Sequence, residues 1–235
     1  MWYDESMPSQ ARIVEVFSSL QGEGLRLGER QIFVRFGGCN LRCDYCDEPA
    51  SRSALAGSLW SAAKLKARIA AVQRASGARR SRAISWTGGE PLLFAGFLRE
   101  MMVWAKRNGF ENHLETNGLF PARLKSLAEF ADVVSMDIKL PTATGRKTWG
   151  AHAASLKIAP DKTSVKVVLT GSSRPSELRN VLEVLKGWPE MTLILQPATG
   201  RAMPAKRALA FFKFARARRK SVVLMRQWHP IWGMR

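Results

Sequence analysis

The chain has 235 residues, enough for a single α/β core. Hydrophobic residues make up 46% and charged residues 24%, and no apolar run approaches the roughly 20 residues that cross a bilayer, so the composition excludes a membrane-spanning chain. The net charge of +18 can attract an anionic partner such as an acidic electron-transfer protein, but much of it is dispersed beside expected helix ends, so a solvated surface is the favoured interpretation.

Apolar, β-branched runs alternate with stretches of helical spacing along the chain. The expected strands are, in order, Ile13–Phe17, Ile32–Phe36, Ala83–Trp86, Asn112–Glu115, Val133–Asp137, Val165–Leu169 and Leu193–Leu195. The expected helices are Leu59–Ala75, Leu92–Asn108, Ala122–Phe130, Ser176–Leu185 and Ala205–Ala217. This alternation predicts an α/β fold, an open partial (β/α) barrel of about six mostly parallel strands with outer helices. We expect one core domain over residues 1–235, with short N-terminal and C-terminal extensions.

Polar or glycine-rich groups follow the expected strands. They are Gly37-Gly38-Cys39, Thr87-Gly88-Gly89-Glu90, Glu115-Thr116-Asn117-Gly118, Asp137-Ile138-Lys139 and Gln196-Pro197. Because the carboxyl ends of parallel strands meet at one edge of a sheet, we expect these groups to surround a common ligand site.

All three cysteines of the chain lie close together, as Cys39, Cys43 and Cys46. An odd number cannot pair completely into disulfides, and such close neighbours would close strained loops. The N-terminus lacks the basic start and apolar stretch of a secretory signal, so the expected compartment is the cytoplasm, which keeps thiols reduced. Zinc usually needs four protein ligands, so a zinc site would need a histidine distant in sequence, from among His113, His152 and His229.

The Cys-x-x-x-Cys-x-x-Cys spacing lets one loop ligate three irons of a 4Fe-4S cluster and leaves the fourth iron open. An open iron can chelate the methionine part of S-adenosylmethionine, and an electron can then cleave the sulfonium bond to give a radical. The loop, which follows Phe33-Val34-Arg35-Phe36, resembles that of the radical S-adenosylmethionine (SAM) superfamily. The resemblance implies a radical SAM type of partial barrel, with Cys39, Cys43 and Cys46 as the catalytic cluster ligands.

Other short motifs resemble the parts of this superfamily that bind S-adenosylmethionine. Thr87–Pro91 resembles its glycine-rich motif, although a plain turn with Glu90 at a helix start would also explain the sequence. Ser135 and Asp137 resemble residues that contact the cofactor's ribose and carboxylate, and a strand-end turn is the alternative. The expected cofactor-binding residues are Tyr45, Gly88, Gly89, Glu90, Ser135, Asp137 and Gln196.

The order of the motifs between Ile13 and Trp232 resembles one family in particular, 7-carboxy-7-deazaguanine synthase. The motifs are Gln21–Gly24, Arg35, the cysteine loop, Thr87–Pro91, Glu115–Gly118 and Gln227–His229. The resemblance implies a carbon–nitrogen lyase that converts 6-carboxy-5,6,7,8-tetrahydropterin to 7-carboxy-7-deazaguanine with loss of ammonia, on the route to queuosine and other deazapurines. It also implies a homodimer and a flavodoxin- or ferredoxin-like reductant.

Two charged residues suit such a substrate. The Glu23 carboxylate can accept paired hydrogen bonds from the amidine-like edge of a pterin. The Arg35 guanidinium can bind the substrate carboxylate with two parallel hydrogen bonds, and a structural salt bridge is the alternative. For Glu115 a turn or helix-capping role stays open, as does a buried polar pair for Gln227 and His229. The expected substrate-binding residues are Gln21, Glu23, Arg35, Thr87, Glu115, Gln227 and His229.

One position departs from the family pattern. The family follows its last cysteine with Asp-Thr, whose hydroxyl helps to hold Mg²⁺, whereas this chain has Asp47-Glu48. The Glu48 carboxylate can bind Mg²⁺ directly, or its length can displace the ion, so Mg²⁺ is a candidate cofactor.

Two other functions remain open from the sequence. A glycyl-radical-activating enzyme, which acts on a partner protein, shares the cysteine loop and the small size. A zinc-stabilised module that binds nucleic acid is suggested by the charge alone, and we otherwise expect no nucleic-acid partner.

Overall fold

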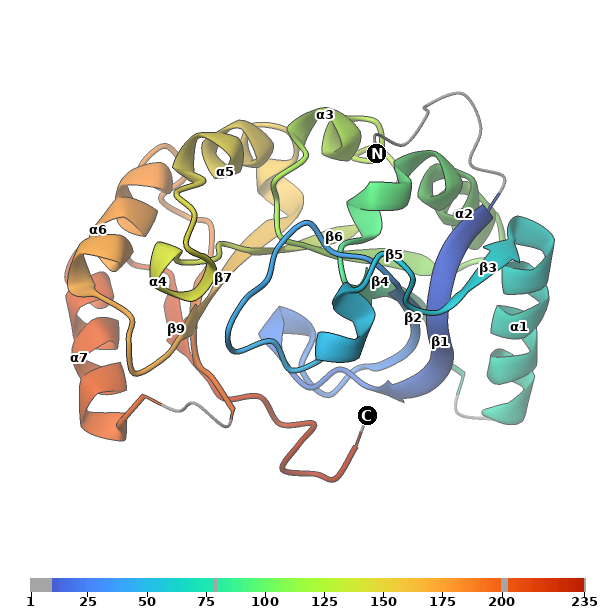
Figure 1. Cartoon of the computed structure of the whole chain (residues 1–235), viewed down its shortest axis with the longest axis horizontal. Coiled ribbons are helices and arrows are strands. Elements are labelled where there is room, and N and C mark those ends of the chain that lie inside the picture. The colour runs from blue at the N-terminus through green and yellow to red at the C-terminus, as the bar shows by residue number, and fades with distance from the viewer. Residues whose placement is uncertain (1–9, 78–79, 200–202, 235) are drawn as a thin grey trace.

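The computed structural model describes residues 10–77, 80–199 and 203–234. Their strands form one nine-stranded sheet in the order β3-β1-β2-β4-β5-β6-β7-β8-β9. All pairs from β2 to β9 are parallel, and β1 and β3 extend one edge in antiparallel pairing. Figure 1 shows the sheet as an arch that stays open on one side, with the helices outside it. The predicted open partial barrel is therefore confirmed.

The elements have the following bounds. The strands are β1 (Gln10–Leu20), β2 (Arg30–Phe36), β3 (Ser58–Ser61), β4 (Ala83–Gly88), β5 (Glu111–Thr116), β6 (Val133–Asp137), β7 (Thr163–Leu169), β8 (Leu193–Pro197) and β9 (Val222–Leu224). The α-helices are α1 (Ala62–Ala75), α2 (Ala95–Arg107), α3 (Pro121–Lys125), α4 (Pro141–Thr144), α5 (Trp149–Leu156), α6 (Pro175–Val184) and α7 (Ala205–Arg216). Short 3₁₀ helices are η1 (Gly24–Arg26), η2 (Pro49–Arg52), η3 (Pro91–Phe94) and η4 (Pro160–Lys162).

The first helix was predicted to begin at Leu59, three residues before the observed start of α1. Leu59 and Trp60 belong to β3, where they pair with β1. The helix α1 begins at Ala62 because the Ser61 hydroxyl accepts a hydrogen bond from the Lys64 amide and caps it. The apolar residues before the cap are thus strand residues, which their spacing alone did not reveal.

Another helix ends earlier than predicted, and the prediction missed helix α5 and strand β9. The helix expected over Ala122–Phe130 ends at Lys125, and the Ser126 hydroxyl next to its end donates to the Arg123 carbonyl at 2.7 Å. Helix α5 was not predicted, because its Gly-, Ala- and Ser-rich sequence lacks a strong apolar period. Strand β9 was also missed, since three residues carry too little pattern.

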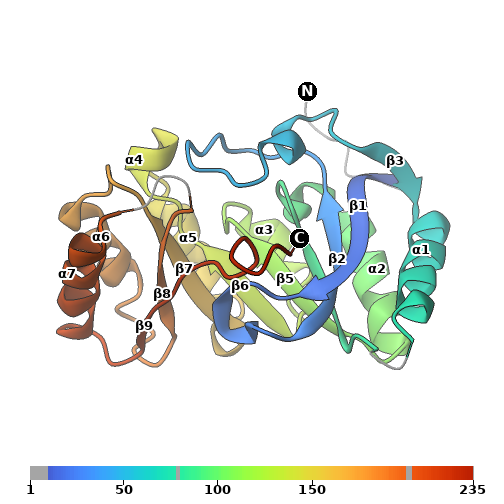
Figure 2. The same cartoon turned by 90° about the horizontal axis from the view of Figure 1, so that it is seen from below.

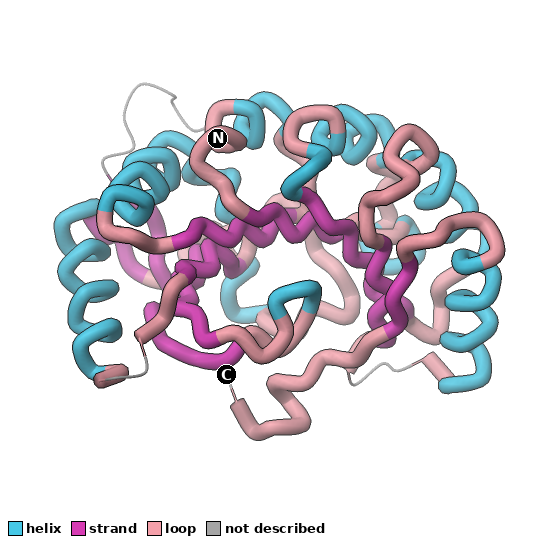
Figure 3. The backbone as a smooth tube through the Cα atoms, turned by 180° about the vertical axis from the view of Figure 1, so that it is seen from behind, coloured by secondary structure: helices cyan, strands magenta, loops and turns pink. Residues whose placement is uncertain are grey.

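Alternation along the strands separates the core from the concave face. On β4, Ile84 and Trp86 are fully buried against the helices, whereas Thr87 faces the other way and lines a cavity. The same alternation puts Glu115 and Lys166 on the concave face. Figure 3 shows the longer helices along the convex side of the strands, with only short helical turns inside the arch. The concave side is therefore free to carry polar side chains.

The last residues of the described chain close the open side of the arch. After β9 the segment runs across the concave side of the sheet, as Figure 2 shows. The Trp228 amide donates to the Gly22 carbonyl at 2.8 Å, which fixes this segment beside the loop after β1. The expected N-terminal extension falls largely on residues 1–9, outside the described residues. Within the described residues, no helix is long and apolar enough to cross a membrane.

Candidate active site

The concave face, the loop of residues 37–48 (the cysteine loop) and the C-terminal segment enclose a cavity of about 530 Å³. Most of the predicted site residues line it. They are Gln21, Glu23, Arg35, Cys39, Cys43, Tyr45, Cys46, Glu48, Thr87, Gly88, Gly89, Glu115, Ser135, Asp137, Gln227 and His229. Glu90 and Gln196 are fully buried next to the cavity instead. The structure thus brings these residues together, and what each one binds stays a prediction.

The three cysteines are free thiols that line the cavity together. Burial raises the pKa of the Cys39 thiol and raises that of Cys43 to about 11, although the Lys139 ammonium opposes both shifts. The raised pKa values keep Cys39 and Cys43 protonated at neutral pH, and a bound metal cation would favour their ionised form.

This set of donors fits an iron-sulfur cluster better than a single ion. Within the described residues, no three His, Cys, Asp or Glu side chains are placed to hold one metal ion. Thiolates around a cubane ligate different irons and stand further apart than ligands of one ion. Two of the three histidines proposed to complete a zinc site have other partners, whereas His229 lines the cavity. His152 bonds to the Asn117 carbonyl at 3.0 Å, and His113 lies between Gln31 and Ser135.

The glycine-rich motif packs directly against the cysteine loop. Gly88 has a φ of 125°, and a Cβ there would lie 2.3 Å from the Phe36 carbonyl oxygen. A Cβ on Gly89 would lie 2.0 Å from the carbonyl oxygen of Gly38. The Glu90 amide donates to that same Gly38 carbonyl at 2.8 Å. Only glycine permits this close approach, which sets the position of the cysteine loop relative to β4.

Glu90 joins two loops rather than lining the cavity. Its carboxylate accepts hydrogen bonds from the Leu92 amide at 3.0 Å, the Thr116 hydroxyl at 2.8 Å and the Asn117 amide at 2.8 Å. Burial raises the pKa of Glu90, and these hydrogen bonds oppose the rise. Glu90 caps the start of η3. This is the helix-start role that the sequence analysis gave as the alternative for this residue.

Asp137 offers an acceptor to a ligand. Its Oδ2 atom pairs with Lys139 at 2.6 Å and with Lys166 at 3.4 Å. Its Oδ1 atom is buried and has no hydrogen-bond partner among the described residues. Since Asp137 lines the cavity, Oδ1 can accept from a hydroxyl of a bound cofactor, which fits the predicted ribose contact. Ser135, two residues earlier, bonds through its hydroxyl to His113 Nε2 at 2.7 Å.

Glu115 accepts hydrogen bonds from three polar side chains. Its Oε1 atom accepts from Gln21 at 2.8 Å and Ser85 at 2.9 Å, and Oε2 accepts from Thr87 at 2.7 Å. The residue lies on β5 with its side chain in the cavity, so the turn or capping alternative is wrong for its position. Gln21, Thr87 and Glu115, predicted separately, therefore form one network.

Glu23 is the centre of a second network. It forms an ion pair with Lys166 through Oε1, and its Oε2 accepts from Gln196 at 2.8 Å and Gln227 at 3.2 Å. Burial alone would favour the neutral acid, but Lys166 and the two amides outweigh it and lower the pKa of Glu23 to about 2. Gln227 also donates to Asp47 at 2.9 Å, so it is no isolated polar pair with His229.

Lys166 was missed by the sequence interpretation. A signal was present: a lysine interrupts the apolar run Val165–Leu169, and strand alternation puts it opposite the core residues Val165 and Val167. The Gln196 amide donates to Glu23, and its predicted contact with the cofactor stays a prediction.

Arg35 already has a carboxylate partner. Its Nε atom donates to Glu15 at 2.8 Å and lies 3.9 Å from Glu48, and its guanidinium stands over the Phe17 ring at 5.8 Å. The salt-bridge alternative is therefore present in the structure. Arg35 also lines the cavity, so its predicted contact with the substrate carboxylate stays open.

The burial of His152 predicts a pH-dependent stability. Burial lowers its pKa from 6.5 to about 4, so the unfolded chain takes up the proton first and folding stability falls as the pH drops from 6.5 towards 4. Between pH 7 and pH 5 we expect the wild type to lose roughly 2 kcal/mol more unfolding free energy than His152→Gln. Urea unfolding at both pH values measures the difference, and parallel losses in the two proteins would contradict the assignment.

Comparison with known proteins agrees with this geometry. The Radical SAM superfamily model matches residues 33–169. The 7-carboxy-7-deazaguanine synthase of Geobacter sulfurreducens is 36% identical over 208 residues, which cover 80% of this chain and 82% of that protein. The same enzyme of Thermococcus kodakarensis is 32% identical over 247 residues, covering 92% and 96%. The crystal structure of QueE from Escherichia coli superposes with a TM-score of 0.64 at 22% identity, covering 92% of this chain and 94% of that one, and so shares the fold. The chain belongs to the radical SAM superfamily and, within it, to the 7-carboxy-7-deazaguanine synthase family.

Proposed function

We propose that this protein is a radical SAM carbon–nitrogen lyase that converts 6-carboxy-5,6,7,8-tetrahydropterin to 7-carboxy-7-deazaguanine and ammonia, for queuosine or another deazapurine. The observation that carries the proposal is the cavity, whose lining combines three free thiols with the buried, ionised carboxylate of Glu23. Thiols suit the cluster, and an ionised carboxylate suits the donor edge of a pterin.

The cavity residues have separate roles in the proposed reaction. Cys39, Cys43 and Cys46 hold a 4Fe-4S cluster, which together with S-adenosylmethionine supplies the radical that takes a hydrogen atom from the substrate. Asp137 accepts a hydrogen bond from the cofactor through its free Oδ1 atom. Glu23 accepts the pterin's donor edge.

An anaerobic assay tests the proposal. Reconstituted protein is supplied with S-adenosylmethionine, a reductant and the carboxypterin, and we expect the deazaguanine product and ammonia without any partner protein. A glycyl-radical-activating enzyme would instead cleave S-adenosylmethionine only beside its protein substrate. A colourless protein that carries one zinc ion and forms no product would contradict the proposal and favour the zinc-stabilised module.

We further propose that Glu48 replaces the family's threonine as a ligand of Mg²⁺. Glu48 and Asp47 put carboxylate oxygens on the cavity wall, and Mg²⁺ commonly uses one or two carboxylates with substrate and water completing its shell. Arg35, 3.9 Å from Glu48, balances part of the added charge.

Glu48→Gln is expected to raise the Mg²⁺ concentration for half-maximal activity by about tenfold or more, because the ligand charge is lost while the side-chain shape is kept. Activity at saturating Mg²⁺ should stay close to that of the wild type. Titration of initial rates with MgCl₂ provides the measurement, with exposed Glu183→Gln as the matched control. An unchanged Mg²⁺ titration would show that Glu48 is not a ligand of Mg²⁺.

The reductant and the assembly are also proposals. Exposed Arg42, Arg146 and Lys147 lie on the cysteine loop and on the segment after α4, and Arg146 donates to the Asn40 carbonyl at 3.4 Å. This basic rim supports an acidic flavodoxin- or ferredoxin-like donor, whose electron transfer should slow with added salt, unlike reduction by dithionite. A homodimer rests on the family resemblance, whereas a single core domain over residues 1–235 and a cytoplasmic location stay predictions from the sequence. Sedimentation velocity tests the dimer.

A further inference from the structure

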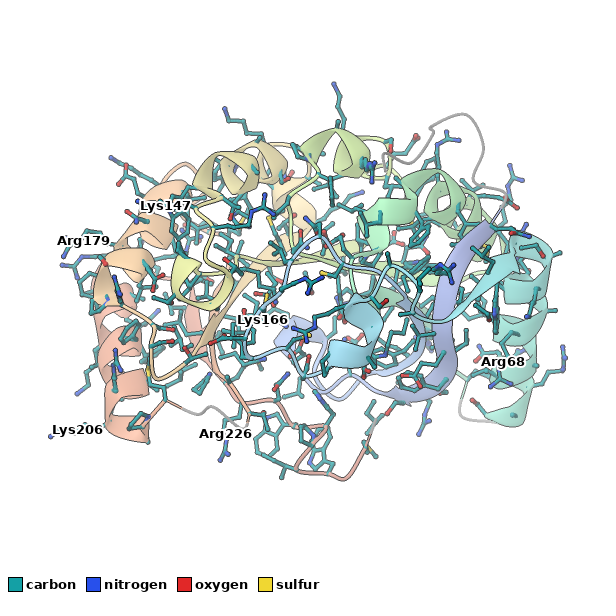
Figure 4. All side chains as sticks on the ribbon, viewed as in Figure 1. Arg68, Lys147, Lys166, Arg179, Lys206 and Arg226 are labelled. Carbon is teal, nitrogen blue, oxygen red and sulfur yellow. The ribbon has the colours of Figure 1, made fainter. Side chains whose placement is uncertain are left out.

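Lys166 is a buried cation on the concave face of β7. Its neighbours Val165 and Val167 are fully buried on the other side of the sheet, and its own side chain is 16% exposed and lines the cavity. Figure 4 shows Lys166 inside the arch, whereas Arg179 and Lys206 lie on the outer helices. A lysine in this position needs carboxylate partners, and it has two, Glu23 and Asp137.

The carboxylate of Glu23 is almost fully occupied in the absence of substrate. A carboxylate has about four acceptor positions. Lys166 takes one on Oε1, and Gln196 and Gln227 take two on Oε2. The bond from Gln227 is the longest at 3.2 Å, and the same amide also donates to Asp47 at 2.9 Å. Gln227 can therefore release Glu23 without losing its other partner.

This release leaves one free position on each oxygen of Glu23, which is what a paired contact with a pterin requires. The edge of a 2-amino-4-oxopyrimidine ring carries, in order, an amino group, a ring N–H and a carbonyl oxygen. If the amino group replaces Gln227 on Oε2, the ring N–H meets Oε1. The carbonyl oxygen then comes next to the group already bonded to Oε1, which is the Lys166 ammonium.

We propose that Lys166 is a specificity-determining residue that donates a hydrogen bond to the 4-oxo group of the pterin and selects against a 4-amino group. The proposal rests on the proposed function and goes beyond it, because it assigns recognition of the 4-oxo group to one residue. The two Glu23 oxygens accept from the amino group and the ring N–H, and the Lys166 ammonium donates to the carbonyl oxygen, so the three protein groups match the three groups of the ring edge. A 4-amino group would point its N–H bonds at an ammonium, which has three donors and no acceptor.

A purely electrostatic role for Lys166, in which it only balances the charge of Glu23, makes a different prediction. Lys166→Met and Lys166→Gln both remove the ammonium, so a loss of charge balance would weaken binding of the oxo ring by the same factor in both. Recognition of the oxo group would instead favour Lys166→Gln, whose amide can still donate to it. The affinities of the two variants for the oxo ring therefore separate the two roles.

The test compares the binding of two fully oxidised rings, 6-carboxypterin and its 2,4-diamino counterpart, which undergo no turnover. Binding to the reconstituted holoenzyme is followed by quenching of ring fluorescence at a pH where both rings are neutral. The wild type is expected to prefer the oxo ring by about 100-fold, since a site built to hydrogen-bond a group rejects an analogue that leaves its donor unpaired. Lys166→Met should lower that preference by about tenfold, and part of it should remain because the neutral diamino ring also lacks the ring N–H that Glu23 accepts.

Lys166→Gln provides a second, independent reading. A glutamine amide can donate to an oxo group or accept from an amino group, so this variant should bind the oxo ring about tenfold more tightly than Lys166→Met does, with a preference between the two rings well below that of the wild type. It decides the question if Lys166→Met fails to hold its cluster. Lys206→Met, the same change on an exposed lysine of α7, should keep the wild-type ratio.

Two negative results have different meanings. If the wild type prefers the oxo ring and Lys166→Gln keeps the full preference, or if the wild type shows no preference, the assignment of Lys166 is overturned. If the wild type binds neither ring with or without S-adenosylmethionine, the pterin site itself is absent and the proposed function fails.

Discussion

Cys43→Ser is expected to abolish product formation, with a loss of more than about 1,000-fold, because the radical chemistry has no comparable route without the cluster. Cys43 is the most buried of the three thiols, and burial raises its pKa to about 11. A serine hydroxyl ionises even less readily and is a poor iron ligand, so the cluster loses one of its three protein contacts. Iron and sulfide content after anaerobic reconstitution, and turnover of the carboxypterin, are measured together.

The same loss is expected for Cys39→Ser and Cys46→Ser, since the chain has no fourth cysteine to take over. Ala50→Ser serves as the control, because it adds a hydroxyl to an exposed position of η2 close to the cluster ligands. Full turnover by any one of the three cysteine variants would overturn the assignment of the cluster. A variant that keeps its iron but forms no product would instead separate cluster binding from catalysis.

Gly88→Ala is expected to lower the free energy of unfolding by about 3 kcal/mol or more, through backbone strain and overpacking together. Gly88 has a φ of 125°, and an added Cβ would lie 2.3 Å from the carbonyl oxygen and 2.4 Å from the amide nitrogen of Phe36. Both contacts are to the backbone of the paired strand β2, which cannot rotate away. Relief of the clash requires the two strands to separate at the point where the cysteine loop begins.

Gly109→Ala is the matched control for this prediction. Gly109 also has a positive φ, of 78°, but an added Cβ meets nothing within 4 Å. It should lose only about 1 kcal/mol, the cost of the left-handed backbone for alanine. Urea unfolding of the two variants under the same conditions gives the difference. Equal losses would mean that the close packing of β2 and β4 adds nothing to the strain.

The sequence was most informative where chemistry depends on residues close together in the chain. The cysteine spacing predicted the cluster loop, because one short loop has to present all three thiols. The apolar runs predicted the parallel strands, because strand alternation is a local property. Polar residues directly after those runs predicted which edge carries the site. Residue pairs such as Ser135 and Asp137 could be assigned to one face for the same reason.

The partners of the charged residues were decided only by the tertiary structure. Lys166 is 143 residues from Glu23, and Gln227 is 204 residues from it, so no local pattern relates them. The same holds for Glu90, whose carboxylate holds the loop at Asn117 rather than lining the cavity. Local spacing fixes the face on which a side chain lies, whereas its hydrogen-bond partner depends on which strands the folded sheet brings opposite each other. For this protein the sequence by itself determined the cluster, the fold class and the family, and the folded chain determined which buried charges meet.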